Sequence, residues 1–542
     1  MKRFVKRMLA LGLGLSMLAP CGVYAAHPAG YWPGMQAYQQ AWDAGDKNAM
    51  ITTGEALLNY YAGLPMDTDT AGVRYNVYYN TYAIYEGMGK LEKAKEALQG
   101  VIDTGTYLGF TDAVIMAKER LRKIDPKAEV YTATTTAQAP YYGAKNEPKT
   151  GVLHGRCYTE GGESAMQNDS IISFYVELGS GHNSAQDYAW KIDTFDNGSR
   201  AILINLNFPS EGNTVSQVNN GSLDGEINET LNYLATLKSP VFLRIGGEMN
   251  VWMTQTTPEA FKQAYTRIAN MARQKAPNAA LVFSPSYASR WGGEMEPYFP
   301  DASLVDWVGA SLYNNKYQNA NSPSSAGDTN DMYFGLNQYA DPVKNLEHTV
   351  DLAKKYNKPV IVTESGSGYA LPSGGEDLSA FAANRTTELY STLTMVYPQV
   401  KAILHFNNNM GGYRYALEGN ATVHSAYQNA IAQNPTFVSS FGAAAPPTYV
   451  PLSQAKGLNG SSVTLRAYCD VPNQAVTVTY TLDGTQVGSS NAMPFSYTLN
   501  VASLTTGNHT LQVKFAATNG YSTTKTYTVT KDASGLISFA QQ

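Results

Sequence analysis

Eight short apolar runs, separated by segments with helical periodicity, limit the fold of residues 150–436 more than any other feature. Each run is long enough for one buried strand, and the segments between them are long enough for the crossovers that parallel strands need. Strands that are covered on both faces read as nearly continuous apolar runs, so a parallel sheet is expected. We expect strands at 151–156, 171–178, 201–208, 241–245, 280–284, 305–312, 360–363 and 402–406, and helices at 223–237, 258–275, 345–356 and 378–396.

Eight strands with intervening helices favour a (β/α)8 barrel, a domain that typically has about 250 residues. A doubly wound open sheet is the structural alternative. Its nucleotide-binding version is disfavoured because no glycine-rich phosphate-binding loop follows an early strand. The prediction is a multidomain chain whose central barrel covers residues 150–436.

The regions before and after the barrel differ from it in their sequence patterns. Residues 30–128 are typical of α-helical hairpins: an aromatic helix precedes a turn at Gly87 and Gly89, and an Ala/Leu-rich helix follows. Ala94 and Ala97 are small enough to let two helices approach closely, so this region resembles a tetratricopeptide-type hairpin. It is expected either to dock a protein or envelope partner or to cap the barrel.

The C-terminal residues 447–535 alternate apolar and polar side chains in short runs. Asp483-Gly484 is a strong hairpin signal, because such turns require positive φ angles. We expect an immunoglobulin-like β-sandwich, similar to bacterial immunoglobulin-like modules. A Thr- and Ala-rich segment over 129–149 with two prolines is expected to be a linker before the barrel.

Residues 1–26 are typical of a signal peptide, with a basic start, a short apolar core and small residues up to Ala26. The apolar core is shorter than the roughly 20 residues that span a bilayer, so a transmembrane protein is not expected. The mature protein is expected to be secreted, periplasmic or at the cell surface. Lipidation at Cys21 stays open, since Pro20 departs from the usual small residue.

The charge and the cysteines exclude several classes. The net charge is −5 and no basic block follows the N-terminus, which argues against a nucleic-acid partner. Cys157 and Cys469 fall in different expected domains, so a disulfide between them is not expected. Neither belongs to a metal-ligand spacing, and no metal is expected.

Two glutamates follow apolar strands in the same way. Glu248 ends the run Phe-Leu-Arg-Ile-Gly-Gly-Glu, and Glu364 ends Val-Ile-Val-Thr-Glu. The C-terminal ends of barrel strands line the active site, and sugar cleavage with retention uses two carboxylates about 5–5.5 Å apart. Each glutamate alone also suits a hydrogen bond to a loop, but the shared context favours catalysis.

The barrel region resembles glycoside hydrolase family 26, whose best-known members are β-mannanases of the retaining clan A. The resemblance rests on ordered segments at 242–250, 261–286, 298–313, 358–366 and 400–407. It implies that Glu248 is the general acid/base and Glu364 the nucleophile, with no cofactor. In two places the chain departs from the family: Gly247 replaces a histidine, and His405-Phe406 stand where a tryptophan platform is usual.

The resemblance also implies substrate-binding roles. Arg244 and Asn250 match the family motif of the fourth strand, and Tyr313 matches the tyrosine that holds the nucleophile. A packing role at the barrel rim stays open for Tyr313, and a role as an internal counter-charge stays open for Arg244. The remaining candidates suit sugar stacking or hydrogen bonding, or alternatively loop anchoring: Trp252, Trp291, His405 and His154.

The favoured function is a secreted, endo-acting, retaining β-glycanase that acts on β-mannan or another β-glycan. A hydrolase of the same clan that acts on xylan, glucan or a bacterial exopolysaccharide is one alternative. The other is a catalytically inactive or weak barrel that binds glycan as an envelope protein, which the replacement of the histidine by Gly247 permits.

Overall fold

The computed structural model describes residues 30–179, 184–209, 213–253, 256–287, 294–316, 341–370, 376–410, 413–443, 446–472 and 474–542. These residues form two compact units that divide between Asp125 and Pro126. The predicted signal peptide, with Cys21, lies outside the described residues. Among the helices described, none has both the length and the apolarity that crossing a membrane demands.

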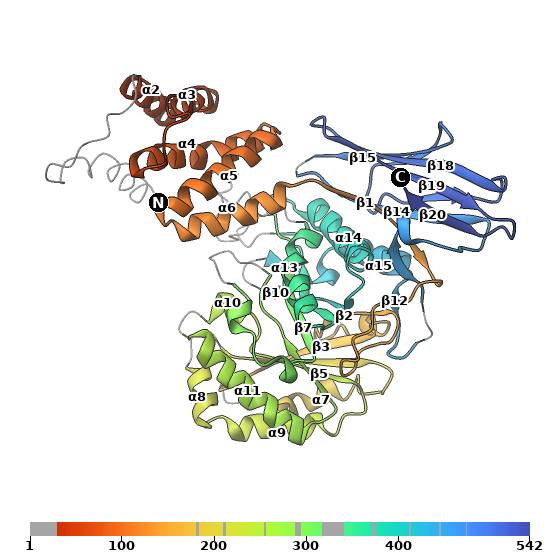
Figure 1. The fold of residues 1–542 in the computed structure, drawn as a ribbon. Coiled ribbons are helices and arrows are strands. Elements are labelled where there is room, and N and C mark those ends of the chain that lie inside the picture. Colours follow the sequence, from red (N-terminus) through yellow and green to blue (C-terminus); the bar gives the residue numbers. More distant parts are fainter. Residues whose placement is uncertain are drawn as a thin grey trace. The chain divides into compact units, whose positions relative to one another are not determined.

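The N-terminal unit consists of helices that each pack on the next along the chain (Figure 1). The close approach of two of them depends on Gly100, because a Cβ there would collide with the ring of Tyr78. The buried pair Arg120–Glu86, with Nε 2.8 Å from Oε1, fixes a third helix to the same core. This confirms the predicted helical region, while the tetratricopeptide resemblance stays a prediction. The helices are α2 (Tyr31–Ala44), α3 (Lys47–Tyr60), α4 (Thr68–Gly87), α5 (Leu91–Leu108) and α6 (Thr111–Ile124).

The second unit contains the predicted barrel. Its strands are parallel neighbours in chain order, and β2 pairs with β9 to close the ring. A short strand, β12 (Phe437–Val438), adds to β2. The barrel strands are β2 (Val152–Cys157), β3 (Ile171–Glu177), β4 (Ala201–Asn207), β5 (Val241–Ile245), β6 (Ala279–Phe283), β7 (Trp307–Tyr313), β8 (Val360–Gly366) and β9 (Val400–His405).

Helices surround the ring, and strand alternation separates two cores. Inward residues such as Phe242 and Trp307 fill the barrel, whereas outward residues such as Leu243 pack under the helices. The larger helices are α8 (Thr214–Asn220), α9 (Asp224–Leu234), α11 (Pro258–Lys275), α13 (Pro342–Lys355), α14 (Ser379–Val396) and α15 (Ala421–Gln433). Together they confirm the (β/α)8 fold class.

The C-terminal region forms two antiparallel sheets, in agreement with the expected immunoglobulin-like class. One has the order β13-β1-β14-β17 and the other β16-β15-β18-β19-β20. The strands are β13 (Thr448–Pro451), β14 (Ser462–Asp470), β15 (Val476–Leu482), β16 (Thr485–Ser490), β17 (Tyr497–Asn500), β18 (Gly507–Ala517), β19 (Ser522–Lys531) and β20 (Ile537–Gln541).

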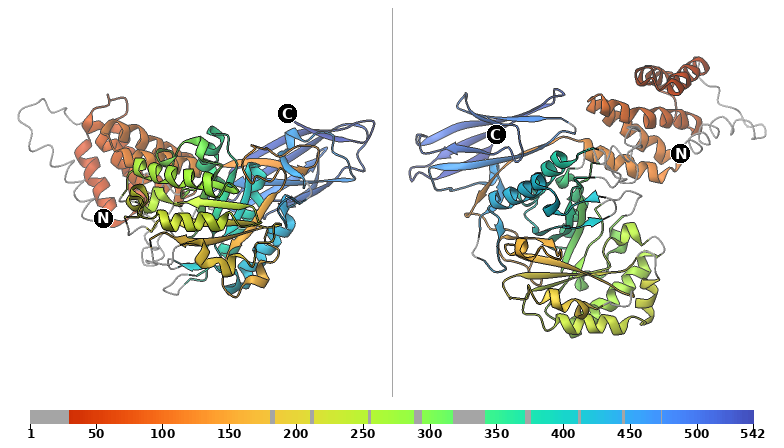
Figure 2. Two further views of the ribbon diagram at one scale, coloured as in Figure 1. Left: turned by 90° about the horizontal axis from the view of Figure 1, so that it is seen from below. Right: turned by 180° about the vertical axis from the view of Figure 1, so that it is seen from behind.

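One strand of these sheets precedes the barrel in the sequence, whereas the other strands follow it. β1 (Lys127–Thr134) lies between β13 and β14, which follow the barrel by sequence (Figures 1 and 2). The prediction of a linker over 129–149 is therefore wrong up to Thr134. A Thr-rich composition is typical of a linker, but alternating threonines also suit a strand.

Buried charges join the first sheet to the barrel. Lys344 of α13 is fully buried, and its Nζ lies 2.5 Å from Oδ2 of Asp470 at the end of β14. The hydroxyl of Tyr468 donates to Oδ1 of Asp341 at 2.8 Å. Removing either side of such a contact leaves a buried charge without its partner, which is strongly destabilising. Because the barrel and the sheets form one compact unit, we expect them to fold as a single unit.

We predict that a chain truncated after residue 443 does not fold, because β1 loses both neighbouring strands and Lys344 loses Asp470. Soluble yield and a cooperative thermal transition are the measurements. A chain that starts at Pro126 is the control, and it should retain the transition of the second unit, because the helical unit has its own core. A cooperatively folded 1–443 chain would contradict the single folding unit.

Candidate active site

The inner face of β5 delivers a buried arginine to the top of the barrel. Phe242 points into the barrel, so strand alternation points Arg244 the same way, and only 1% of its surface is exposed. The strand ends at Gly246, whose φ of 57° is left-handed. A Cβ at Gly246 would also crowd the ring of Phe208. Glycine is thus required where the chain turns away from the strand.

A β-bulge brings Glu364 to the same face. The register of β7 against β8 shifts after Ala310, so that Thr363 is the extra residue between the partners Val362 and Glu364. The Thr363 hydroxyl lies 2.8 Å from the Ser284 hydroxyl of the β6 strand end. Bulges change the direction of the side chain that follows. Without this one, Glu364 would face the surrounding helices.

Arg244 and Glu364 form the centre of a hydrogen-bond network. The Nη1 group of Arg244 donates to Oε1 of Glu364 and, at 3.2 Å, to Oδ1 of Asn205. Its Nη2 donates to the Ser311 hydroxyl at 2.7 Å. The Tyr313 hydroxyl donates to the other carboxylate oxygen, Oε2, at 2.7 Å. Each oxygen of Glu364 therefore accepts a hydrogen bond, one of them charge-assisted.

Glu248 follows β5 and acts on this network through its charge. Its backbone has a φ of 57°, and its N–H donates to Ser284 O at 2.9 Å. Burial lowers the pKa of Arg244, but the charges of Glu364 and Glu248 together shift it upward. Burial and the same two carboxylates raise the pKa of Tyr313. Two side chains thus lie within the electrostatic reach of both glutamates.

The side-chain amide of Asn250 is hydrogen-bonded to the backbone of Ser286. Its Nδ2 donates to Ser286 O at 3.0 Å, and its Oδ1 accepts from Ser286 N at 2.8 Å. This closed pair fixes the loop after β6 against the short helix α10 (Met249–Trp252). The contact supports the backbone that carries Glu248.

Gly247 has a steric role that the sequence did not indicate. A Cβ on this residue would lie within 3.0 Å of Cζ, Nε and Nη2 of Arg244. The guanidinium therefore occupies the space that a side chain at position 247 would need. Gly247 is therefore coupled sterically, through Arg244, to the hydrogen-bond network on Glu364. Its role is not limited to the absence of the histidine that the family has at this position.

An aromatic cluster covers one side of the network. Tyr313 lies 5.3 Å from Tyr415 and 5.9 Å from Phe406, and Phe406 lies 6.1 Å from Tyr175, measured between ring centroids. Burial, followed by the charge of Glu364, raises the pKa of Tyr175. Sequence analysis missed Tyr175, although it shares the inner face of β3 with Ser173, two residues earlier. Asn205, Ser311 and Tyr415 were also missed.

The structure places two predicted histidines away from the carboxylates. His154 and His405 alternate with the inward residues Leu153 and Leu404. The ring of His154 packs on Phe437, and the Nε2 of His405 donates to Tyr415 O at 2.9 Å. Burial lowers the pKa of each histidine to about 4. Both contacts are structural, and neither brings its imidazole to the network on Glu364.

Of the two tryptophans, Trp291 lies outside the described residues, and only the backbone of Trp252, at the end of α10, is described. Their predicted stacking roles stay predictions. Across the described ranges, no cluster of three or more His, Cys, Asp or Glu side chains suits a metal ion. Cys157 and Cys469 are buried free thiols.

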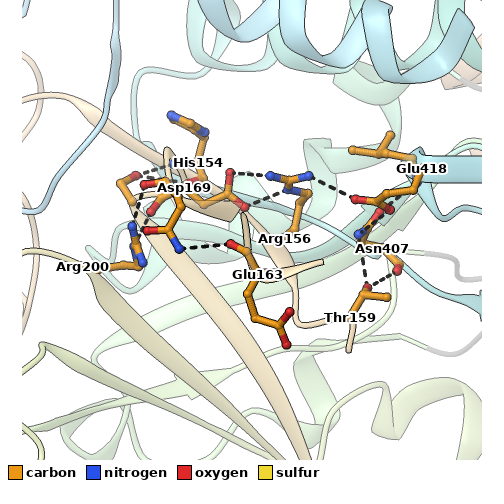
Figure 3. A network of polar contacts seen from close by, with 11 residues as sticks. His154, Arg156, Thr159, Glu163, Asp169, Arg200, Asn407 and Glu418 are labelled. Carbon is orange, nitrogen blue, oxygen red and sulfur yellow. Dashed lines mark hydrogen bonds and ion pairs between the residues drawn. The ribbon is translucent and has the colours of Figure 1, made fainter. Parts of the chain in front are cut away.

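A second polar network fixes the neighbouring loops (Figure 3). Arg156, on the outer face of β2, donates from Nε to Oδ2 of Asp169 at 2.8 Å and approaches Glu418 at 3.5 Å. Asn407 donates to Glu418 at 3.0 Å and to the Thr159 hydroxyl at 3.2 Å. The chain segments that follow β2 and β9 are thereby held together.

Comparisons with known proteins agree with parts of this organisation. Residues 450–513 match the family described as a bacterial Ig domain. A β-1,3-xylanase from a Vibrio species is 26% identical over 147 residues, which is 26% of this chain and 30% of that protein. A β-1,3-xylanase from an Alcaligenes species is 24% identical over 143 residues, 26% of this chain and 28% of that protein. The chain thus spans less than a third of these relatives' length.

Among solved structures, similar chains include an endo-β-1,4-mannanase double mutant from Cellulomonas fimi. It has 14% identity and a TM-score of 0.41, and it covers 73% of this chain and 99% of its own. A family 26 β-mannanase from Bacteroides ovatus has 17% identity and a TM-score of 0.39, with 54% and 92% covered.

We predict that Gly247→Ala destabilises the protein by about 2 kcal/mol, because the new methyl displaces the buried guanidinium from its partners. Chemical denaturation measures the effect. In an Arg244→Met background the same substitution should cost much less, since the colliding group is absent. Gly225→Ala in α9 is the control, because a Cβ there meets no atom within 4 Å. Equal costs in both backgrounds would rule out the coupling.

We predict that the protein loses stability as the pH falls from about 6.5 to 4. Both histidines have a lower pKa in the folded state than in the unfolded chain, so the unfolded state binds more protons in this window. Each contributes about 3 kcal/mol at most. Burial raises the pKa of Asp169 to about 6, which acts in the opposite direction.

The variants His154→Gln and His405→Gln isolate the histidine effect. Denaturation at pH 7 and pH 4.5 should show a smaller loss of unfolding free energy in each variant than in the wild type. The variant His509→Gln is the control, because His509 lies beside Asp483, which raises its pKa. Identical losses in the wild type and both buried-histidine variants would disprove the assignment.

Proposed function

We propose that this chain is a retaining glycoside hydrolase of the family 26 type that cleaves a β-linked polysaccharide. The observation that carries the proposal is the position of Glu364, whose two oxygens accept from Arg244 and Tyr313, at the same end of the barrel at which Glu248 follows β5. They come from the C-terminal ends of β5 and β8, where barrel enzymes carry their catalytic residues.

Glu364 is the proposed nucleophile. Its two oxygens accept from Arg244 and Tyr313, which hold the carboxylate in one orientation toward the barrel mouth. It would attack the anomeric carbon and form a covalent glycosyl-enzyme as the leaving oxygen departs. Because the carboxylate is already held in place, less entropy is lost when it attacks the anomeric carbon.

Glu248 is the proposed acid/base. It would protonate the leaving oxygen in the first step, then take a proton from the water that attacks the glycosyl-enzyme. Glu248 is half-buried, in contrast to the buried Glu364, which suits a group that exchanges protons with substrate and solvent. The chemistry requires no metal or organic cofactor.

For the substrate, we propose a β-mannan or a β-1,3-xylan. The family resemblance favours mannan. The xylan is supported by the two matching segments of about a quarter of the chain, because both relatives are named β-1,3-xylanases. An endo mode of cleavage and export from the cytoplasm are part of the proposal. The helical unit is proposed to dock a protein or envelope partner.

We predict that Glu248→Ala and Glu364→Ala each lower kcat by about 10³-fold, and that Glu364→Ala also lowers Tm, because it leaves the buried Arg244 without its charged partner. Release of reducing sugar from mannan, β-1,3-xylan, β-1,4-xylan and mixed-linkage glucan is the measurement. Azide should restore turnover of Glu364→Ala with inversion, since it replaces the missing nucleophile. Glu259→Ala, on the outer helix α11, is the matched control.

Full activity in either glutamate variant would refute the catalytic assignment. A second function, glycan binding without cleavage, is favoured instead if the wild type binds one of these glycans with no turnover and Glu364→Ala leaves the affinity unchanged. Isothermal titration with each glycan separates the two.

A further inference from the structure

A lysine at the opposite end of the barrel strands has no partner for its buried charge. Lys401 is the second residue of β9, and 1% of its surface is exposed. Its Nζ makes no hydrogen bond with any residue that the structure describes. A buried ammonium without acceptors is costly, because it has lost the water that solvated it. Something that accepts hydrogen bonds is therefore expected beside it.

A β-bulge places this lysine outside the regular packing. The register of β8 against β9 shifts after Val360, so that Lys401 is the extra residue between the partners Val400 and Ala402. Val400 packs under the helices and Ala402 packs inside the barrel. The bulge therefore frees Lys401 from both cores, as bulges do where a side chain serves a site.

Lys401 lines a cavity of about 220 Å³. The wall of this cavity is formed by segments that precede the barrel in the sequence and by segments that follow it, where the chain passes between the barrel and the C-terminal sheets. Lys401 is the one ionisable side chain among its described lining residues, and the others that carry polar side chains include Thr135, Gln138, Thr150, Thr394 and Thr448. Hydroxyl and amide groups can donate to an anion, as the ammonium does.

Glu147 does not neutralise this site by direct contact. Its charge acts on Lys401, but its oxygens accept from the backbone N–H of Tyr142 at 3.0 and 3.1 Å and of Ala144 at 3.1 Å. Among the described residues, the Nζ of Lys401 makes no hydrogen bond to Glu147. The ammonium group of Lys401 therefore has three N–H donors that no described residue accepts, and it lines a cavity.

We infer that this cavity binds a small oxyanion, such as phosphate, sulfate or a carboxylate, with Lys401 as its charged donor. The ammonium has donors and no acceptor, so the complementary ligand is negative and rich in acceptors. The site joins segments that precede β2, β9 and β13, so a bound anion would strengthen the junction between the barrel and the sheets. The inference does not depend on the proposed hydrolase activity.

The test is the thermal unfolding of the full chain in the presence of inorganic phosphate, sulfate or acetate, with sodium chloride at matched ionic strength as reference. The wild type should show a saturable rise in Tm with at least one oxyanion, since a ligand that binds only the folded state stabilises it. Comparing the three separates tetrahedral anions from carboxylates.

Lys401→Met, which keeps the length of the side chain, should lower the apparent affinity by about tenfold or more. Lys238→Met, at an exposed position, is the matched control and should respond like the wild type. No saturable rise in the wild type, or an equal response in Lys401→Met, would overturn the inference.

A second variant covers the case in which Lys401→Met does not fold. Glu147→Gln removes the negative charge that competes with the anion, so its apparent affinity for the same oxyanion should increase. An unchanged or weaker response in this variant would also count against the site.

Discussion

The buried charge of Arg244 is the interaction on which the centre of the barrel depends. A guanidinium that water cannot reach is tolerated only when its donors meet acceptors. Here Asn205, Ser311 and Glu364 supply acceptors to Nη1 and Nη2 from strands β4, β7 and β8. One side chain therefore ties three barrel strands together and orients the carboxylate that we propose as nucleophile.

Backbone irregularities create the geometry that the regular barrel would not provide. Gly246 and Glu248 are left-handed, which turns the chain sharply at the end of β5. The bulge at Thr363 turns Glu364 inward. A second bulge, at Lys401, acts at the opposite end of the strands. Bulges are common next to functional sites because one extra residue redirects a side chain at little cost to the sheet.

The C-terminal sheets are part of the same compact unit as the barrel. β1 crosses to them before the barrel begins, and Lys344 is buried against Asp470 at the junction. The sheets contain one strand that precedes the barrel in the sequence and several that follow it. They are therefore not attached to the barrel by a single flexible linker. Its position next to the cavity of Lys401 also explains how an anion there would affect the stability of both parts.

Local pattern predicted many of the barrel elements, while the catalytic roles of the two glutamates stay a proposal. The apolar run 241–245 coincides with β5, and the helix predicted over 258–275 coincides with α11, since strand and helix periodicities are local properties. The prediction that Arg244 and Tyr313 belong with the two glutamates also followed from the strand ends and the family resemblance.

Long-range packing decided the rest. The Thr-rich segment became β1 because strands more than 300 residues later pair with it. His154 and His405 point outward because a shift of one residue along a strand changes the face. The role of Gly247 depends on the rotamer of Arg244, and the solitary charge of Lys401 depends on a bulge. The sequence alone thus indicated the barrel strands and the two glutamates near the ends of β5 and β8, but not β1. Only the tertiary structure decided which side chains meet, because contacts between distant segments leave no periodic signal.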